Sequence, residues 1–103
     1  MDRISRILEL LQQSPGDNFL EHALALEYIK LGREDEARKL FESILNRDPG
    51  YIGSYYHLAK LLERNNETQL AISWYEKGMR EAKNAGDQHA YSELQSAYDE
   101  LIY

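Results

Sequence analysis

The residues of this chain that could do chemistry are its histidines, carboxylates and tyrosines. His22, His57 and His89 could bind a metal, but no two are four residues apart, the spacing that places two imidazoles on one helix face. The acidic runs at 34–36 and 99–100 fall at expected helix starts or polar faces, where a solvated carboxylate is the normal outcome. The chain has no cysteine, Gly-rich phosphate loop or serine nucleophile elbow. The sequence therefore predicts no catalytic residue, no cofactor, no metal site and no enzyme activity.

The tyrosines raise a different possibility, that of a binding surface. Residues 48–62, DPGYIGSYYHLAKLL, place three tyrosines and a histidine within seven positions. Such clusters occur both in recognition surfaces and in packed cores. Which of these side chains is buried depends on the helical register, so the elements that carry them must be placed first.

Composition limits the classes of function. A chain of 103 residues with 43% hydrophobic and 29% charged residues predicts one folded domain. A net charge of −6 opposes binding to nucleic acid or anionic lipid, which clustered Lys and Arg would drive. No apolar run is long enough to span a membrane, and Asp2 and Glu9 interrupt what would be a signal peptide. With no cysteine, the expected location is the cytoplasm.

The two prolines, Pro15 and Pro49, are 34 residues apart and indicate an internal repeat. A shift of 34 places small residues on small ones and large apolar residues on large ones: Leu24 on Leu58, Ala25 on Ala59, Ala37 on Ala71 and Phe41 on Tyr75. These are positions that packing would constrain. The chain therefore contains two related units.

Each unit is expected to consist of two helices. Leu20, Leu24 and Tyr28 recur every four residues, which is typical of an amphipathic helix. Gly32 ends that helix, and Asn66 takes the equivalent place in the second unit, because both residues tolerate the left-handed conformation. A second helix follows each of these turns. The helix after Leu70 is expected to continue to about Ala85, and Gly86 with Asp87 starts a final helix.

These residues resemble the tetratricopeptide repeat family. The likeness is carried by LALEYIKLGREDEARKLFESILNRDP and YYHLAKLLERNNETQLAISWYEKG, the latter preceded by DPGY. Two departures matter: Glu21 stands where the first repeat should have a large aromatic residue, and Lys83 replaces the terminal proline of the second. The first should weaken a packing contact. Gly78, in the middle of a helix, is expected to permit close approach of the final helix.

The resemblance implies an all-α fold, an alpha-alpha superhelix of about six antiparallel helices in a single domain. We expect a leading half-repeat helix at 1–16, repeats at 18–51 and 52–85, and a capping helix at 87–103. In this register Tyr55, Leu58 and Ala59 belong to the core. The side of the first helices that faces the concave groove in this family carries the candidate partner-binding residues: Phe19, His22, Leu26, Tyr56, His57, Lys60 and Arg64.

Two functions remain open at this point. The first is a non-enzymatic scaffold that binds a peptide or helix of another protein in its concave groove. The alternative is self-assembly as a homodimer through the last helix, which carries Tyr91, Tyr98 and Tyr103. The chain would then be a monomer or a weak homodimer. The identity of the partner does not follow from the fold.

Overall fold

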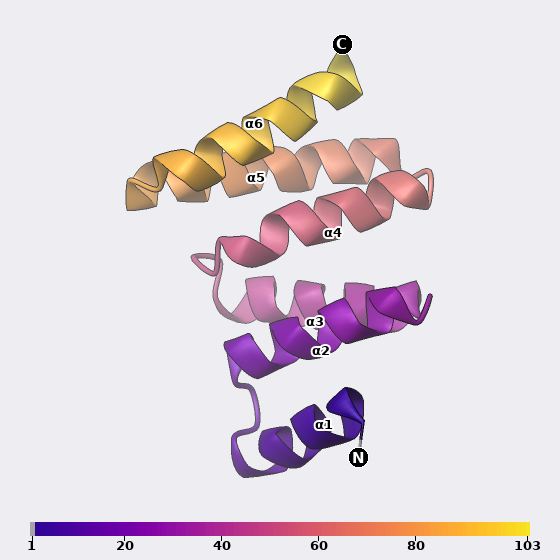
Figure 1. Cartoon of the computed structure of the whole chain (residues 1–103). Coiled ribbons are helices and arrows are strands. Elements are labelled where there is room, and N and C mark those ends of the chain that lie inside the picture. Colours follow the sequence, from indigo (N-terminus) through magenta and orange to yellow (C-terminus); the bar gives the residue numbers. More distant parts are fainter. Residues whose placement is uncertain (1) are drawn as a thin grey trace. The chain divides into compact units, whose positions relative to one another are not determined.

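The computed structural model describes residues 2–103, and this part of the chain forms six helices without a strand. The helices are α1 (Arg3–Gln13), α2 (Asn18–Lys30), α3 (Glu34–Arg47), α4 (Gly53–Arg64), α5 (Thr68–Ala85) and α6 (Gln88–Ile102) (Figure 1). They form two compact units, with α1 to α3 in the first and α4 to α6 in the second. The predicted all-α fold of about six helices is confirmed. No helix within residues 2–103 is long and apolar enough to cross a membrane.

Aspartate side chains start both of the first two helices. The carboxylate of Asp2 accepts a hydrogen bond from the backbone N–H of Ser5 at 2.7 Å, and that of Asp17 accepts one from the N–H of Leu20 at 3.0 Å. Each satisfies a donor that would otherwise be unpaired at the helix N-terminus. The core of the first unit consists of Ile7, Leu24, Ala25, Ala37, Phe41, Ile44 and Leu45.

The turn between the two helices of each repeat has the same backbone geometry. Gly32 has a φ of 76° and Asn66 a φ of 63°, both left-handed. The N–H of the next residue then bonds back to the helix, from Arg33 to Tyr28 O at 2.8 Å and from Glu67 to Leu62 O at 2.9 Å. This is the bond that closes a helix after a left-handed residue. The predicted equivalence of Gly32 and Asn66 is confirmed.

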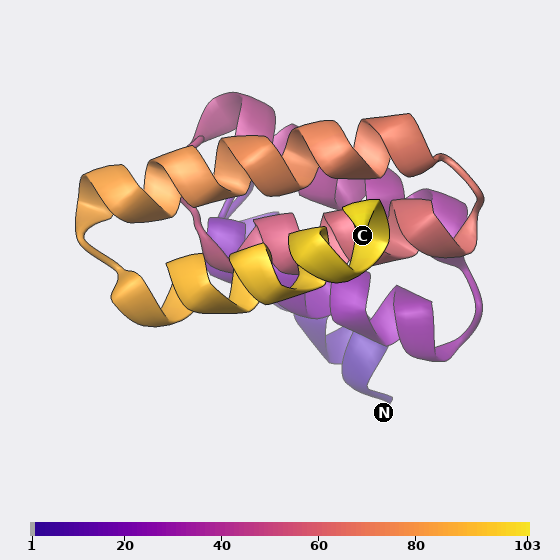
Figure 2. The same cartoon turned by 90° about the horizontal axis from the view of Figure 1, so that it is seen from above.

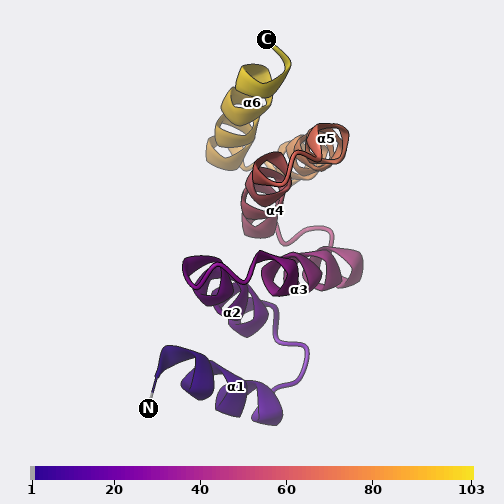
Figure 3. The same ribbon diagram turned by 90° about the vertical axis from the view of Figure 1, so that its right-hand side faces the viewer.

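In the second unit, α5 packs against both α4 and α6, and α4 touches α6 over fewer residues (Figure 3). Figure 2 shows α5 and α6 side by side in opposite directions, joined by the turn at Gly86. Gly86 has a φ of 72°, and the carboxylate of Asp87 accepts a hydrogen bond from the N–H of Ala90 at 3.0 Å. The predicted run of α5 to Ala85 and the Asp87 cap of α6 are both confirmed.

Gly78 lies where three helices meet. A Cβ added there would come within 2.8 Å of Cβ and Cγ of Tyr55 on α4, and within 3.1 Å of Cδ1 of Leu94 on α6. The sequence predicted close approach of the final helix, and Leu94 confirms it. Tyr55 is the closer of the two neighbours. Gly78 therefore also allows α5 to pack directly against Cβ and Cγ of that buried tyrosine.

Glu21 occupies the place where a large aromatic residue was expected. The guanidinium of Arg47, on α3, donates to Glu21 at 3.2 Å and to the side-chain oxygen of Asn18 at 2.6 Å. An ion pair between the start of α2 and the end of α3 therefore stands where the repeat pattern has aromatic packing. The Glu21 side chain is only 14% exposed, which strengthens such a pair relative to a fully solvated one.

Candidate protein-interaction surfaces

The first-unit surface is formed by Phe19, His22 and Leu26 on α2. Phe19 is 71% exposed, whereas His22 and Leu26 are half-buried. The His22 ring packs edge-on against Phe41 of α3, with 5.4 Å between ring centroids. His22 thus contributes to helix packing, and Phe19 is the large apolar side chain that this surface presents to solvent.

The three residues of α4 assigned to the core are buried. Tyr55, Leu58 and Ala59 each have 0% exposure. The hydroxyl of Tyr55 donates a hydrogen bond to the carbonyl oxygen of Pro49 at 2.6 Å. Burial raises the pKa of Tyr55 to about 12, with the nearby Glu81 and Asp48 acting in the same direction. This tyrosine is therefore a neutral core residue, and the predicted helical register of α4 is confirmed.

The second-unit surface is formed by Tyr56, His57, Lys60 and Arg64, also on α4. The rings of Tyr56 and His57 meet edge-on at 5.8 Å, and Nζ of Lys60 lies 5.8 Å from the Tyr56 centroid. Tyr56, His57 and Lys60 are half-buried, while Arg64 is exposed at the end of the helix. Burial lowers the pKa of His57, partly offset by Glu93 on α6. The cluster combines aromatic rings with cations on one helix.

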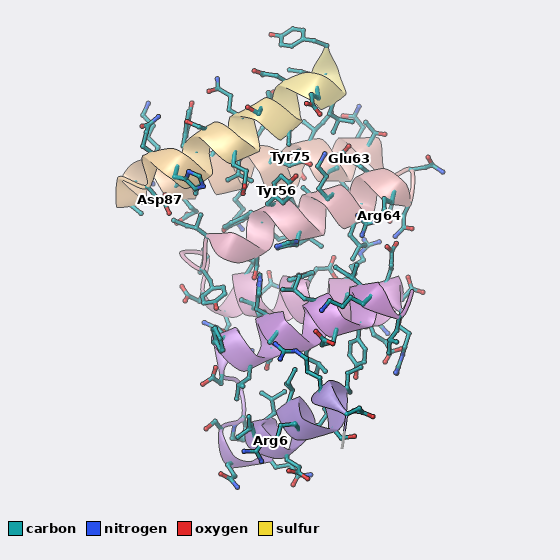
Figure 4. The ribbon with its side chains drawn as sticks, in the orientation of Figure 1. Arg6, Tyr56, Glu63, Arg64, Tyr75 and Asp87 are labelled. Atoms are coloured by element: carbon teal, nitrogen blue, oxygen red, sulfur yellow. The ribbon has the colours of Figure 1, made fainter. Side chains whose placement is uncertain are left out.

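A carboxylate of α4 connects this surface to α5. Glu63 accepts a hydrogen bond from the hydroxyl of Tyr75 and lies 3.6 Å from Nζ of Lys60 (Figure 4). Burial raises the pKa of Tyr75, and the hydrogen bond to Glu63 raises it further. Tyr75 was expected only as an apolar residue of the second helix, and no sequence pattern indicated a partner for its hydroxyl. Lys60 is therefore partly compensated within the second unit.

A further surface, between α5 and α6, was not recognised as a site from the sequence. Tyr91 and Tyr98 were expected on the last helix as part of a homodimer face. The structure places both beside α5, where they line a pocket of about 420 Å³ together with Glu76, Met79, Arg80 and Lys83. The phenol of Tyr98 donates to Glu76 at 3.0 Å, and that bond raises the pKa of Tyr98.

The described residues offer no place for a metal ion. Within residues 2–103, no three His, Asp or Glu side chains are grouped so that they could bind one. No buried side-chain nitrogen or oxygen in this range lacks a hydrogen-bond partner.

Comparisons with known proteins agree with this fold. The profile of the family described as "Tetratricopeptide repeat" matches residues 28–98. Two structures of a tetratricopeptide repeat domain protein from Salinibacter ruber are 42% identical to this chain. The solution structure has a TM-score of 0.82 and covers 85% of this chain and 89% of its own, and the crystal structure has a TM-score of 0.79 and covers 82% and 94%.

Two other relatives are more distant. The solution structure of a Bordetella parapertussis protein is 26% identical with a TM-score of 0.84, covering 98% of this chain and 88% of its own. The mouse aspartyl/asparaginyl beta-hydroxylase is 30% identical over 70 residues, which are 68% of this chain. The match spans only 9% of the length of that protein.

Proposed function

Because the chain belongs to the tetratricopeptide repeat family, we propose that it is a non-enzymatic interaction module that binds a peptide or helix of a partner protein. Proteins built on this fold generally bind other proteins. The proposed contact residues are those of the first helices of the two repeats: Phe19, His22, Leu26, Tyr56, His57, Lys60 and Arg64.

The exposure of Phe19 is the observation that carries this proposal. A phenylalanine that is 71% exposed leaves most of its apolar surface in water. Complete burial of such a side chain is worth about 1.5 to 3 kcal/mol, so a partner that covers it could gain about 1 to 2 kcal/mol. Aromatic anchors of this kind often carry much of the binding energy of an interface.

The second-unit surface, taken by itself, is more polar and combines an aromatic ring with cations. Tyr56 offers an aromatic face, Lys60 approaches it at 5.8 Å, and Arg64 is exposed one helical turn further on. These groups fit a partner segment with an acidic residue beside an aromatic or aliphatic one. Glu63 already compensates Lys60 in part, so Tyr56 is expected to matter more for affinity than Lys60.

A partner captured by pull-down from the native organism, identified by mass spectrometry, provides the ligand for the test. It is titrated against Phe19→Ser, Tyr56→Ala and the double change Lys60→Glu with Arg64→Glu. Loss of tenfold or more in affinity, about 1.4 kcal/mol, is expected for the first two variants. Ser73→Glu, on an exposed position of α5, is the control. Unchanged affinity in all variants that remain folded would reject the proposed surfaces.

Self-assembly through α6 is a second candidate function. Ile102 is 38% exposed and Tyr103 is 96% exposed at the end of this helix. Both are large apolar or aromatic side chains that a second copy could cover. Size-exclusion chromatography with light scattering tests this function, and a dimer that Tyr103→Ser dissociates is the expected result. A monomer at all concentrations would reject it.

A further inference from the structure

A groove in the second unit, separate from the first-helix surfaces, runs between α5 and α6. One part of it, of about 420 Å³, lies along the two helices, and another, of about 250 Å³, lies at the turn that joins them. Lys83 and Tyr91 line both parts, so the two depressions adjoin. We call this the α5–α6 groove and define it by Glu76, Met79, Arg80, Lys83, Tyr91 and Tyr98.

The first carboxylate of the α5–α6 groove is already engaged. Glu76 and Arg80 are four residues apart on α5, the spacing at which a glutamate and an arginine pair on a helix. Glu76 instead accepts a hydrogen bond from the phenol of Tyr98 at 3.0 Å. That bond ties α6 to α5 and leaves the guanidinium of Arg80 without this partner.

The second carboxylate near the groove has a structural role as well. Asp87 follows Lys83 by four residues and lines the part of the groove at the turn. Its carboxylate caps α6 by accepting the N–H of Ala90 at 3.0 Å. Asp87 is labelled in Figure 4 at the turn between the two helices. The ammonium group of Lys83 therefore also lacks its local acidic partner.

Arg80 and Lys83 are thus two exposed cations on one side of α5, three residues apart. Neither forms an ion pair within residues 2–103. The half-buried side chains of Met79 and Tyr91 lie in the same groove and supply thioether and aromatic surface. The arrangement is complementary to a carboxylate next to an apolar side chain.

We propose that the α5–α6 groove binds an acidic segment of a partner protein, with a carboxylate at Arg80 and Lys83 and an aromatic or large aliphatic side chain against Tyr91. A second copy of this chain is a poorer occupant. In a two-fold dimer the same groove would face itself and bring the unpaired cations of both copies together. A phosphate backbone is a poorer ligand too, because its binding depends on many clustered cations, and the residues that line the two parts of the groove include two, Arg80 and Lys83.

Random peptides displayed on phage are the probe for this site. Peptides selected on the full-length chain should contain Asp or Glu within a few positions of an aromatic or large aliphatic residue. A selected peptide, made synthetically, should bind at least tenfold more weakly to the double variant Arg80→Glu with Lys83→Glu. It should lose affinity similarly when its own acidic residues are changed to amides. Lys39→Glu, an exposed charge reversal on α3, is the control and should bind normally.

Three results would overturn the proposal. The first is a selection that yields no binder or only binders without acidic residues. The second is equal affinity for the wild type and for the Arg80→Glu, Lys83→Glu double variant, with circular dichroism showing both folded. The third is a dimer in light scattering that the double variant dissociates, because a second copy would then occupy the groove. Arg80→Gln with Lys83→Gln keeps the test valid if charge reversal unfolds the protein.

This test is independent of the proposed function. Selected peptides could instead bind more weakly to Phe19→Ser or Tyr56→Ala but equally well to the Arg80→Glu, Lys83→Glu double variant. That result would support the first-helix surfaces and overturn the α5–α6 groove. Peptides with the opposite pattern support the groove, whatever the outcome of the partner titration.

Discussion

Replacement of Gly78 by alanine should destabilise the protein, although the same change in the middle of a helix usually stabilises it. Alanine is favoured over glycine in a helix interior by about 1 kcal/mol. Against this, the new Cβ would lie 2.8 Å from both Cβ and Cγ of Tyr55 and 3.1 Å from Cδ1 of Leu94. Tyr55 cannot turn away, because it is fully buried and its hydroxyl is bonded to Pro49 O at 2.6 Å.

The expected magnitude follows from these opposing effects. Overpacking of a core usually costs about 1 to 3 kcal/mol, and contact with the stem of a fixed side chain favours the upper half of that range. Subtraction of the helix preference leaves a net loss of about 1 to 2 kcal/mol in the free energy of unfolding. For a domain of this size, that corresponds to a fall in Tm of about 5 to 15 °C.

Urea unfolding followed by circular dichroism and calorimetry would measure the effect of Gly78→Ala. The matched control is Gly53→Ala, because Gly53 is an exposed first residue of α4 and a Cβ there meets nothing within 4 Å. This control should leave stability unchanged or raise it slightly. A Gly78→Ala protein more stable than the wild type would refute the close packing of α5 on Tyr55.

The other predictions concern packing, one ion pair, protonation and the last helix. Ala71→Leu, at a fully buried position of α5, should cost about 1 to 3 kcal/mol, whereas Ser73→Leu on the exposed side should be mild; equal thermal shifts would contradict the helical register. Arg47→Met should lower stability by about 0.5 to 1 kcal/mol at low salt and by less at high salt, as urea titrations would show. Because burial lowers the pKa of His57 below 6.5, the unfolded state binds this proton more readily. Stability should therefore fall as the pH falls through about 6.5, and His57→Gln should flatten that part of the Tm profile. Deletion of residues 86–103 should expose the buried side of α5 and cause aggregation; unchanged solubility and Tm would show that α6 is dispensable.

The helices and their ends could be predicted from the sequence because they depend on nearby residues. The fourfold spacing of Leu20, Leu24 and Tyr28 marks a helix, and Gly32 and Asn66 mark the turns, since few other residues adopt a left-handed backbone without strain. The buried positions of α4 also followed from periodicity and the repeat. The role of Glu21 could not be predicted from this pattern. Its partner Arg47 is distant in the chain, and the two residues pair only once α2 and α3 have packed together.

The candidate surfaces were predictable only as faces of helices. The sequence by itself determined that α4 carries Tyr56, Lys60 and Arg64 on a side away from its core residues, because helical geometry fixes which residues share a face. The sequence could not determine which cations are paired with a carboxylate, because the partner of a carboxylate depends on all the donors that the folded chain brings near it. Tertiary structure alone decided that Glu76 bonds to Tyr98, a residue 22 positions away, instead of to Arg80 at the local spacing. That choice leaves Arg80 available at the α5–α6 groove, and it depends on the packing of α6 against α5.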